Sequence, residues 1–359
     1  LAWSKCTSAL FYLGVITKHC AVLGDARILS GIAPASIALV VTSPPYPMIP
    51  MWDRTFGIDE KQLQRAADEA WETMVHEVMA GMTAVRERLV PGGFLCLNIG
   101  DALRSPAGRF RRFPNAGALE LGIARLDLEL LPAIHWYKPT NAPNKFLGSG
   151  MLPGAAYVTL EHERIILARC PGERKDSNFR EQRRASAVFW AERNRFFSDH
   201  WQLGAAAQSP VAGSVRRSAA FPPELAYRLI LMYSVYGDTV LDPYAGTGTT
   251  GVAALAAARN SVCVERDPLL SDAALSRLSS ADSLRWAQER VAQRLTERRG
   301  GRHHNRFYGA VHTSQETDLE LRPPIRFVTE VESSTATRRG CPRDREVCVE
   351  HSAPRAPDA

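Results

Sequence analysis

The sequence lacks any pair of cysteines at CxxC spacing, although seven cysteines are distributed along its 359 residues. Because the seven are scattered and odd in number, we expect neither a disulfide framework nor a zinc cluster, and a reducing cytoplasm fits this usage. The chain also lacks a long apolar run near its start: the apolar segment at residues 9–16 is too short to span a bilayer and is expected to belong to the core. These absences argue against secreted disulfide-rich proteins, zinc proteins and membrane proteins.

The whole chain has no large excess of one charge, since 44 Lys and Arg face 38 Asp and Glu, giving a net charge of +6. The excess is local. Residues 164–217 contain eleven Arg and Lys against five Asp and Glu, so this segment alone holds a surplus of six. A concentrated basic segment suits a polyanionic partner such as nucleic acid, and an ordinary solvated surface is the alternative.

Apolar β-branched runs alternate with helical patterns along the chain. Residues 37–42 are a continuous apolar run that ends just before two prolines, as in a buried parallel strand. Residues 59–90 repeat apolar side chains at a spacing of three and four, which predicts a helix. Further strands are expected at residues 94–99, 126–137, 163–169, 239–241 and 261–264. This alternation predicts an α/β fold with a doubly wound, mainly parallel sheet.

A glycine-rich turn follows the predicted strand at residues 239–241 and leads into a helix. Gly246 and Gly248 permit positive φ and a close backbone approach to a ligand, and the free amides at the helix start favour a polar or negative group. Glu265 ends the next strand, where dinucleotide-type folds bind ribose hydroxyls. Residues 246–251 also satisfy the GxGxxG pattern, so a dinucleotide site is an open alternative.

The second chemical motif is Ser43-Pro44-Pro45-Tyr46, directly after the strand at residues 37–42. Exocyclic amines of nucleobases are poor nucleophiles, and Ser43 Oγ and the Pro44 carbonyl can accept hydrogen bonds from such an amine. The two prolines fix the backbone and remove competing donors. Tyr46 offers a face for stacking a flipped-out base. A purely structural Pro-Pro strand end is the alternative, but ligands bind at the carboxyl ends of parallel strands.

Together and in this order, residues 43–46 (SPPY) and 241–250 (LDPYAGTGTT) resemble the β-class DNA amino-methyltransferases, whose catalytic half precedes the cofactor half. The resemblance implies a class I S-adenosylmethionine-dependent methyltransferase fold with a circularly permuted motif order. It implies S-adenosyl-L-methionine as cofactor, no metal, and double-stranded DNA as substrate, with direct transfer to a flipped-out base and commonly a cognate restriction endonuclease alongside. Ser43 resembles the cytosine-N4 variant, because adenine-N6 relatives usually have Asp or Asn there. Adenine specificity remains the alternative.

The resemblance also implies which residues form the site. The catalytic set is Ser43, Pro44, Pro45 and Tyr46. The expected cofactor set is Asp25, Asp101, Phe221, Asp242, Tyr244, Gly246, Gly248, Thr249 and Glu265. Within it, Asp25 is expected at the cofactor adenine and Glu265 at the ribose. The expected DNA-binding set is Lys138, Arg174, Lys175, Arg180, Arg183, Arg184, Arg193 and Arg195. His162 has no metal-ligand spacing around it and is interpreted as structural.

The predicted organisation is a catalytic half at residues 1–170, an inserted target-recognition region at 171–213 that does not continue the sheet, a cofactor-binding half at 214–299, and a polar, disordered tail at 300–359. Two other functions stay open. An RNA or protein methyltransferase shares the fold, but its cofactor motif normally comes first in the sequence. A DNA-binding module with an inactive cofactor site is disfavoured by the intact cofactor turn. The recognition sequence and the oligomeric state cannot be read from the chain.

Overall fold

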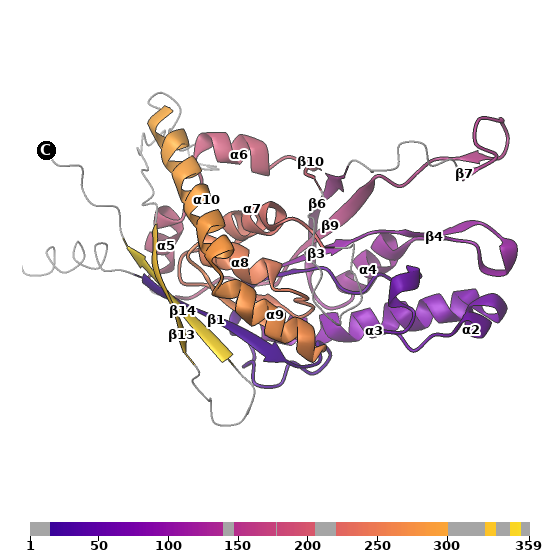
Figure 1. The fold of residues 1–359 in the computed structure, drawn as a ribbon, viewed down its shortest axis with the longest axis horizontal. Coiled ribbons are helices and arrows are strands. Elements are labelled where there is room, and N and C mark those ends of the chain that lie inside the picture. Colours follow the sequence, from indigo (N-terminus) through magenta and orange to yellow (C-terminus); the bar gives the residue numbers. More distant parts are fainter. Residues whose placement is uncertain are drawn as a thin grey trace, which may run out of the picture.

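The apolar runs of the sequence form the centre of one large sheet in the computed structural model, which describes residues 15–138, 147–176, 178–204, 220–300, 327–334 and 345–352 (Figure 1). Within these residues the order of strands in the sheet is β10 (His200–Gln202), β6 (Glu129–Tyr137), β9 (His162–Arg169), β3 (Leu89–Ile99), β2 (Ile37–Thr42), β11 (Thr239–Asp242), β12 (Asn260–Glu265), β1 (Val15–Leu23), β14 (Arg345–Ser352) and β13 (Phe327–Ser334). Two short hairpins stand apart from it, β4 (Ala102–Arg104) with β5 (Arg111–Phe113) and β7 (Leu147–Gly148) with β8 (Ala156–Tyr157).

The strands from β1 through β12, β11 and β2 to β3 are parallel to their neighbours, so their carboxyl ends meet at one edge of the sheet, called here the carboxyl edge. The opposite edge is called the amino edge. β9 runs antiparallel between β3 and β6, and β6 therefore points the same way as β3. The predicted doubly wound, mainly parallel sheet is confirmed, and this arrangement brings the turns after β1, β2, β11 and β12 together.

Helices cover both faces of the sheet (Figure 1). They are α2 (Glu60–Arg65), α3 (Ala67–Arg88), α4 (Asn115–Ala124), α5 (Phe179–Ala185), α6 (Trp190–Phe196), α7 (Pro223–Tyr233), α8 (Thr249–Ala256), α9 (Pro268–Leu278) and α10 (Ala281–Gly300). Leu39 and Val41 of β2 pack in one core with α7 and α8, whereas Val40 packs in a second core with α3 and α4. Because neither face meets water, β2 is buried at every position, and residues 37–41 are all apolar rather than alternately so.

The helix expected at residues 59–90 is interrupted. Ala66 leaves the helical region with φ −144° and ψ 57°, so the segment divides into α2 and α3. The Pro91-Gly92-Gly93 sequence, expected as a break between helix and strand, instead lies inside β3. A register shift between β2 and β3 accommodates it.

The segment at residues 171–213 was expected to stand outside the sheet, and this is wrong for β10. That strand pairs in parallel with β6, His200 opposite His135 and Gln202 opposite Tyr137, and extends the sheet by one strand. Arginine-rich composition hid a three-residue strand that is too short to show a periodic pattern. Residues 205–219 lie outside the described part of the chain.

The polar tail at residues 300–359 was expected to be disordered, which does not hold for two of its segments. β14 pairs antiparallel with β1, and β13 pairs with β14, so they add a hairpin at the far side of the sheet. Each segment contains two valines within a short stretch, a β-branched content that the average composition of the tail concealed. The remainder of the tail lies outside the described residues. Within the described residues, no helix has both the length and the apolar character needed to cross a bilayer.

Candidate active site at the carboxyl edge

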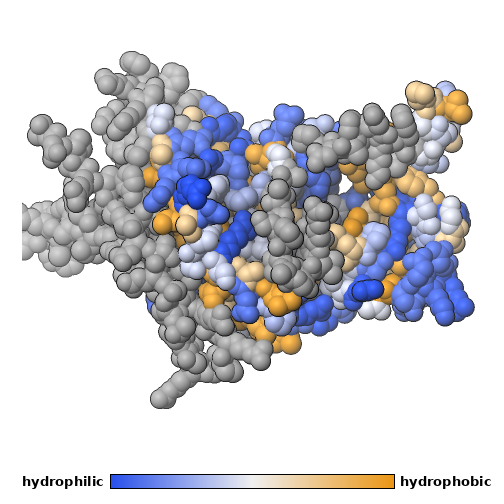
Figure 2. All heavy atoms as spheres, viewed as in Figure 1, coloured by the Kyte–Doolittle hydropathy of each residue, from blue (hydrophilic) through white to orange (hydrophobic). Residues whose placement is uncertain are grey.

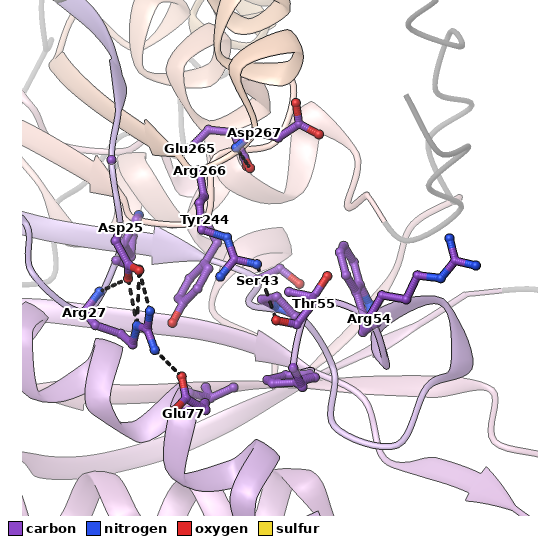
Figure 3. Close-up of a pocket in the computed structure, with 17 residues that line it drawn as sticks. Asp25, Arg27, Ser43, Arg54, Thr55, Glu77, Tyr244, Glu265, Arg266 and Asp267 are labelled. Carbon is purple, nitrogen blue, oxygen red and sulfur yellow. Dashed lines mark hydrogen bonds and ion pairs between the residues drawn. The ribbon is translucent and has the colours of Figure 1, made fainter. Parts of the chain in front are cut away.

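A cavity of about 390 Å³ opens at the carboxyl edge, among the turns that follow β1, β2, β11 and β12 (Figure 3). This volume lies in the range of small-molecule sites. Its lining residues are Gly24, Asp25, Ala26, Arg27, Ser43, Pro45, Trp52, Arg54, Thr55, Phe56, Glu77, Val78, Pro243, Tyr244, Glu265, Arg266 and Asp267. Five residues predicted from the sequence are thus brought together from four separate segments: Asp25, Ser43, Pro45, Tyr244 and Glu265.

Glu265 is fixed at this cavity by the backbone. Its Oε2 accepts a hydrogen bond from the Gly246 amide at 2.8 Å, and its Oε1 accepts one from the Asp267 amide at 3.0 Å. Each carboxylate oxygen has a further lone pair. Two fixed acceptors side by side suit a pair of neighbouring hydroxyls, as a ribose presents.

Asp25 lies at a charged end of the cavity. Arg27 contacts Asp25 at 2.7 Å and Glu77 of α3 at 2.5 Å, so the guanidinium bridges two carboxylates (Figure 3). The hydrogen bonds from Arg27 lower the pKa of Asp25 below its usual value. Asp25 therefore stays ionised at neutral pH and offers acceptors to an amine.

Tyr244 forms part of the cavity wall between Asp25 and Glu265 (Figure 3). Its hydroxyl points at α3, where a Cβ at Gly81 would collide with it. A glycine in the middle of a helix usually weakens the helix. Here Gly81 makes room for the aromatic side chain.

Asp242 does not line the cavity, and its expected contact with the cofactor stays a prediction. It is buried, and its carboxylate accepts hydrogen bonds from Thr42 Oγ1 at 2.6 Å, from Thr250 Oγ1 at 2.6 Å and from the Tyr244 amide at 3.1 Å. Burial raises its pKa to about 6. In this structure Asp242 ties β2 and α8 to the turn after β11.

Other members of the predicted cofactor set also stand outside the lining: Asp101, Phe221, Gly246, Gly248 and Thr249. Asp101 caps α4 and pairs with Arg112 at 3.0 Å, Phe221 is buried in the core, and Thr249 Oγ1 accepts a hydrogen bond from Arg277 at 2.9 Å. Gly246 adjoins the cavity through its bond to Glu265. Their contact with a cofactor stays a prediction.

The catalytic turn differs from expectation at its aromatic residue. Ser43 and Pro45 line the cavity, but Tyr46 is only 6% exposed and does not. Its hydroxyl lies 3.0 Å from Ser43 Oγ, donates to Glu163 Oε2 at 2.7 Å and accepts from Asn98 Nδ2 at 2.8 Å. Burial, followed by the charge of Glu163, raises the pKa of Tyr46 well above its ordinary value. These bonds hold the ring inside the sheet edge, so the expected open stacking face is not available there.

The sequence reasoning missed several residues at the site. Trp52 and Phe56 line the cavity from the segment after the turn and supply aromatic surface close to Ser43. Glu163 of β9 and Asn98 of β3 surround Tyr46. The available signal was a polar residue inside an apolar strand, because buried polar groups need partners. Such a polar residue indicates that it has a hydrogen-bond partner but not which residue that partner is.

The predicted DNA-binding residues do not gather at the cavity. Lys138 directly follows β6 and forms an ion pair with Glu163, next to the turn at residues 43–46. Arg174 pairs with Asp238, the residue before β11, at 2.7 Å, and is largely buried. Since β11 begins at the amino edge, Arg174 lies at the edge opposite Ser43.

α5 also lies at the amino edge of the sheet. Its end is fixed at the amino edge, because the Ser186 hydroxyl accepts a hydrogen bond from the Tyr236 amide just before β11. The exposed basic residues of this segment are therefore remote from Ser43: Lys175, Arg180, Arg183 and Arg184. Arg193 and Arg195 belong to α6, which is anchored to α10 by the buried ion pair of Glu192 with Arg294. The contact of these residues with DNA stays a prediction.

Comparison with known proteins identifies the family of this chain. Residues 37–275 match the family model described as DNA methylase, which covers both N6 and N4 methyltransferases. The type II methyltransferase M.MthZI of Methanothermobacter thermautotrophicus is 41% identical over 307 residues, covering 80% of this chain and 86% of the relative. The type II methyltransferase M.MjaI of Methanocaldococcus jannaschii is 41% identical over 274 residues, covering 72% of this chain and 90% of the relative.

Solved structures show the same fold. A DNA modification methylase of Thermus thermophilus, described as putative and solved in complex with S-adenosyl-L-methionine, matches with a TM-score of 0.56 and 33% identity, covering 73% of this chain and 93% of that one. The cytosine-N4-specific PvuII DNA methyltransferase matches with a TM-score of 0.52 and 19% identity over 72% and 86% of the two chains, which supports the fold alone. On the family match and the two relatives at 41% identity, the chain belongs to the N6 and N4 DNA methylase family.

Proposed function

We propose that this protein transfers a methyl group from S-adenosyl-L-methionine to the exocyclic N4 of cytosine in duplex DNA at a specific sequence. We further propose that it acts in the cytoplasm as the modification enzyme beside a cognate restriction endonuclease, as the type II names of its relatives suggest. One observation carries the proposal: Ser43 opens onto the same cavity as Asp25 and Glu265. An acceptor for the target amine and acceptors for a nucleoside cofactor thus share one space.

The cavity residues suit the cofactor. Glu265 has two fixed oxygens for the ribose hydroxyls, Asp25 is an ionised acceptor for the adenine amine, and Tyr244 offers an aromatic surface between them. When bound, S-adenosyl-L-methionine supplies an electrophilic methyl group on a sulfonium. The chain's own contribution is to hold the acceptor amine in line with that methyl.

Ser43 Oγ and the Pro44 carbonyl are the proposed acceptors for the hydrogens of the target amine. Ser43 is also the reason for proposing cytosine, since adenine-specific members of the family usually have Asp or Asn at this position. Trp52 and Phe56 line the cavity and take the stacking role that the buried Tyr46 leaves open. Adenine N6 on the same scaffold is the second candidate.

The proposed DNA-facing surface is the carboxyl edge, flanked by two projecting hairpins (Figure 1). Half of the large exposed hydrophobic side chains recorded for the described residues lie on these hairpins: Phe110, Met151, Leu152, Tyr157 and Val158. Figure 2 shows hydrophobic residues gathered at the tip of the β7–β8 hairpin, at the upper right. Phe110 stacks on Tyr157 with ring centroids 4.8 Å apart, so the two hairpins touch.

An apolar tip on a DNA-facing hairpin suits extrusion of a base, because apolar side chains can enter the duplex and replace the stacking of the base that leaves. Exposed Arg54 and Arg109 stand at the same edge and can contact phosphates. We therefore locate the proposed duplex contact here rather than at α5.

The test is mass spectrometry of nucleosides from duplex DNA incubated with the protein and S-adenosyl-L-methionine. N4-methylcytosine is the expected product. N6-methyladenine would overturn the proposed base. No methylated base in spite of calorimetrically detected cofactor binding would favour an RNA substrate, and undetectable cofactor binding would favour a DNA-binding module with an inactive cofactor site.

A further inference from the structure

We propose that Glu163 is a positioning residue that acts through Tyr46 to make Ser43 a hydrogen-bond acceptor toward the target amine. The inference rests on the proposed function, because it assigns a cause to the acceptor role of Ser43. Glu163 belongs to β9, 120 positions beyond Ser43 in the sequence, and does not line the cavity. Its influence on the reaction is therefore indirect.

The group is buried and closely packed. Glu163 and Tyr46 are each 6% exposed and Asn98 is 2% exposed. Tyr46 Oη lies 2.7 Å from Glu163 Oε2, 2.8 Å from Asn98 Nδ2 and 3.0 Å from Ser43 Oγ. Asn98 Nδ2 also donates to Glu163 Oε2 at 2.6 Å. Residues of β3, of β9 and of the turn after β2 thus meet at one phenol oxygen.

The direction of each bond follows from the donor inventory. An ionised carboxylate only accepts, so the single proton of Tyr46 is directed to Glu163. The Asn98 amide nitrogen only donates, and it occupies one lone pair of the phenol oxygen. The remaining lone pair faces Ser43, so Ser43 must give its own proton to Tyr46.

This leaves the hydroxyl oxygen of Ser43 with its lone pairs toward the cavity and no proton there. Such an oxygen can accept from an amine and cannot donate to it. Without the constraint, a serine hydroxyl rotates and presents either role. The arrangement is preorganised for the charge that develops on the amine nitrogen during methyl transfer.

Lys138 holds the other carboxylate oxygen of Glu163. Its ammonium forms an ion pair with Glu163 Oε1, on the side away from Tyr46. The high pKa of Tyr46 keeps the phenol protonated, as the donation to Glu163 requires.

The first variant is Glu163→Gln. A glutamine amide can donate to the phenol oxygen, which allows Tyr46 to donate to Ser43 and Ser43 to turn its proton into the cavity. We expect kcat to fall by roughly 10- to 100-fold with little change in the affinity for S-adenosyl-L-methionine. The matched control is Glu161→Gln, because Glu161 accepts from the Tyr137 hydroxyl at 3.0 Å in a similar pair with no link to Ser43. Its kcat is expected to stay within about twofold of the wild type.

The second variant, Tyr46→Phe, removes the hydroxyl that connects the two residues and should lower kcat to a similar extent. In the double variant the two losses should not multiply, because Glu163 has no other route to Ser43. Thermal unfolding shows whether a lower kcat comes from the lost hydrogen bond or from a smaller amount of folded protein. If Glu163→Gln does not fold, the Tyr46→Phe effect alone decides.

Multiplying losses, or an unchanged kcat in Tyr46→Phe, would overturn the inference. These outcomes are distinct from failure of the proposed function. The wild type is assayed in the same experiment for N4-methylcytosine, and its inactivity would remove the proposed function itself.

Discussion

Single side chains at this site owe their properties to buried neighbours from distant parts of the chain. Ser43 lines the cavity, while its hydroxyl is hydrogen-bonded to the buried Tyr46. Asp242 fixes the turn after β11 without lining the cavity. At the residue scale, functional and supporting roles therefore separate according to which groups line the cavity. That separation leads to two predictions.

Replacing Ser43 by Ala should lower turnover by roughly two to three orders of magnitude, because one preorganised acceptor for the developing charge is lost. Cofactor affinity should remain, since the acceptors at Asp25 and Glu265 are untouched. Single-turnover methylation and calorimetry measure the two quantities. Turnover equal to that of the wild type would remove Ser43 from the chemistry.

Replacing Asp242 by Asn should stabilise the fold at neutral pH. The folded-state pKa of Asp242 is about 6 against an ordinary 3.8, so its ionised form costs roughly 3 kcal/mol in the folded state. The hydrogen bonds can persist, because Thr250 Oγ1 lies 3.3 Å from the Val41 carbonyl and can donate there while accepting from the Asn amide.

The sign of the pH effect follows. A raised carboxyl pKa contributes stability that is complete below about pH 4 and is lost as the pH rises through about 6. The difference in unfolding free energy between variant and wild type should thus grow from pH 4 to pH 6 and then level off. Urea unfolding at several pH values tests this, and a difference independent of pH would contradict the buried-charge account.

At the scale of elements, the cavity is formed by the turns at strand ends, and neighbouring helices hold these turns in place. The start of α8 is an example: Gly246 and Gly248 both have positive φ, 54° and 77°. A Cβ at Gly246 would meet nothing within 4 Å, whereas one at Gly248 would lie 3.0 Å from Ala274 Cβ and 3.2 Å from its Cα. The two glycines are therefore not equivalent.

Gly246→Ala should cost about 1 kcal/mol of stability from backbone strain. Gly248→Ala should cost more, roughly 2–4 kcal/mol, because α9 must also move away from α8. Thermal unfolding ranks the variants, and calorimetry shows whether cofactor affinity follows the same order. Equal losses of stability in the two variants would mean that the close contact with Ala274 adds nothing to the cost of Gly248→Ala.

The β7–β8 hairpin offers an element-scale test of the DNA-facing surface. Met151 is 86% exposed and Leu152 is 71% exposed, so changing both to Ser should leave stability within about 0.5 kcal/mol. Methylation of duplex DNA should fall, while methylation of a single strand or a mismatched target base should fall less, since less unstacking is required. An equal loss on all substrates would argue against a role in base extrusion.

At the scale of the whole molecule, charge is distributed between two opposite edges of the sheet. Arg54 and Arg109 are exposed at the carboxyl edge, and Arg183 and Arg184 are exposed on α5 at the amino edge. Changing the first pair to Ala should reduce the slope of log affinity against log salt for duplex DNA by roughly 1–2. The second pair is the matched control and should leave the slope unchanged. A flatter slope for the α5 pair would restore the original sequence-based assignment.

Sequence patterns located the parts of the site that depend on local order. The buried strand at residues 37–42 and the glycine turn after β11 show their nature within about ten residues, and parallel strand packing then brings their ends together. The bonding of Tyr46 to Glu163 joins residues 117 positions apart. No periodicity encodes such a contact, so the burial of Tyr46 could not be foreseen.

The same limit applies to the position of the basic segment in the fold. Composition reports that residues 164–217 are positive but not which edge they reach, because that depends on β9 running antiparallel and delivering the chain to the amino edge. Had β9 been parallel, Arg174 and α5 would have emerged beside Ser43. Strand direction, rather than charge, decides this part of the surface.

The C-terminal hairpin has a consequence for shortening the chain. β14 covers the outer side of β1, and β1 delivers Asp25 to the cavity. Deleting residues from 327 onward would turn β1 into an unpaired border with a row of free amides and carbonyls, which invites self-association through strand addition. By pairing with β1, the C-terminal hairpin therefore protects from aggregation the strand that leads to part of the proposed cofactor site.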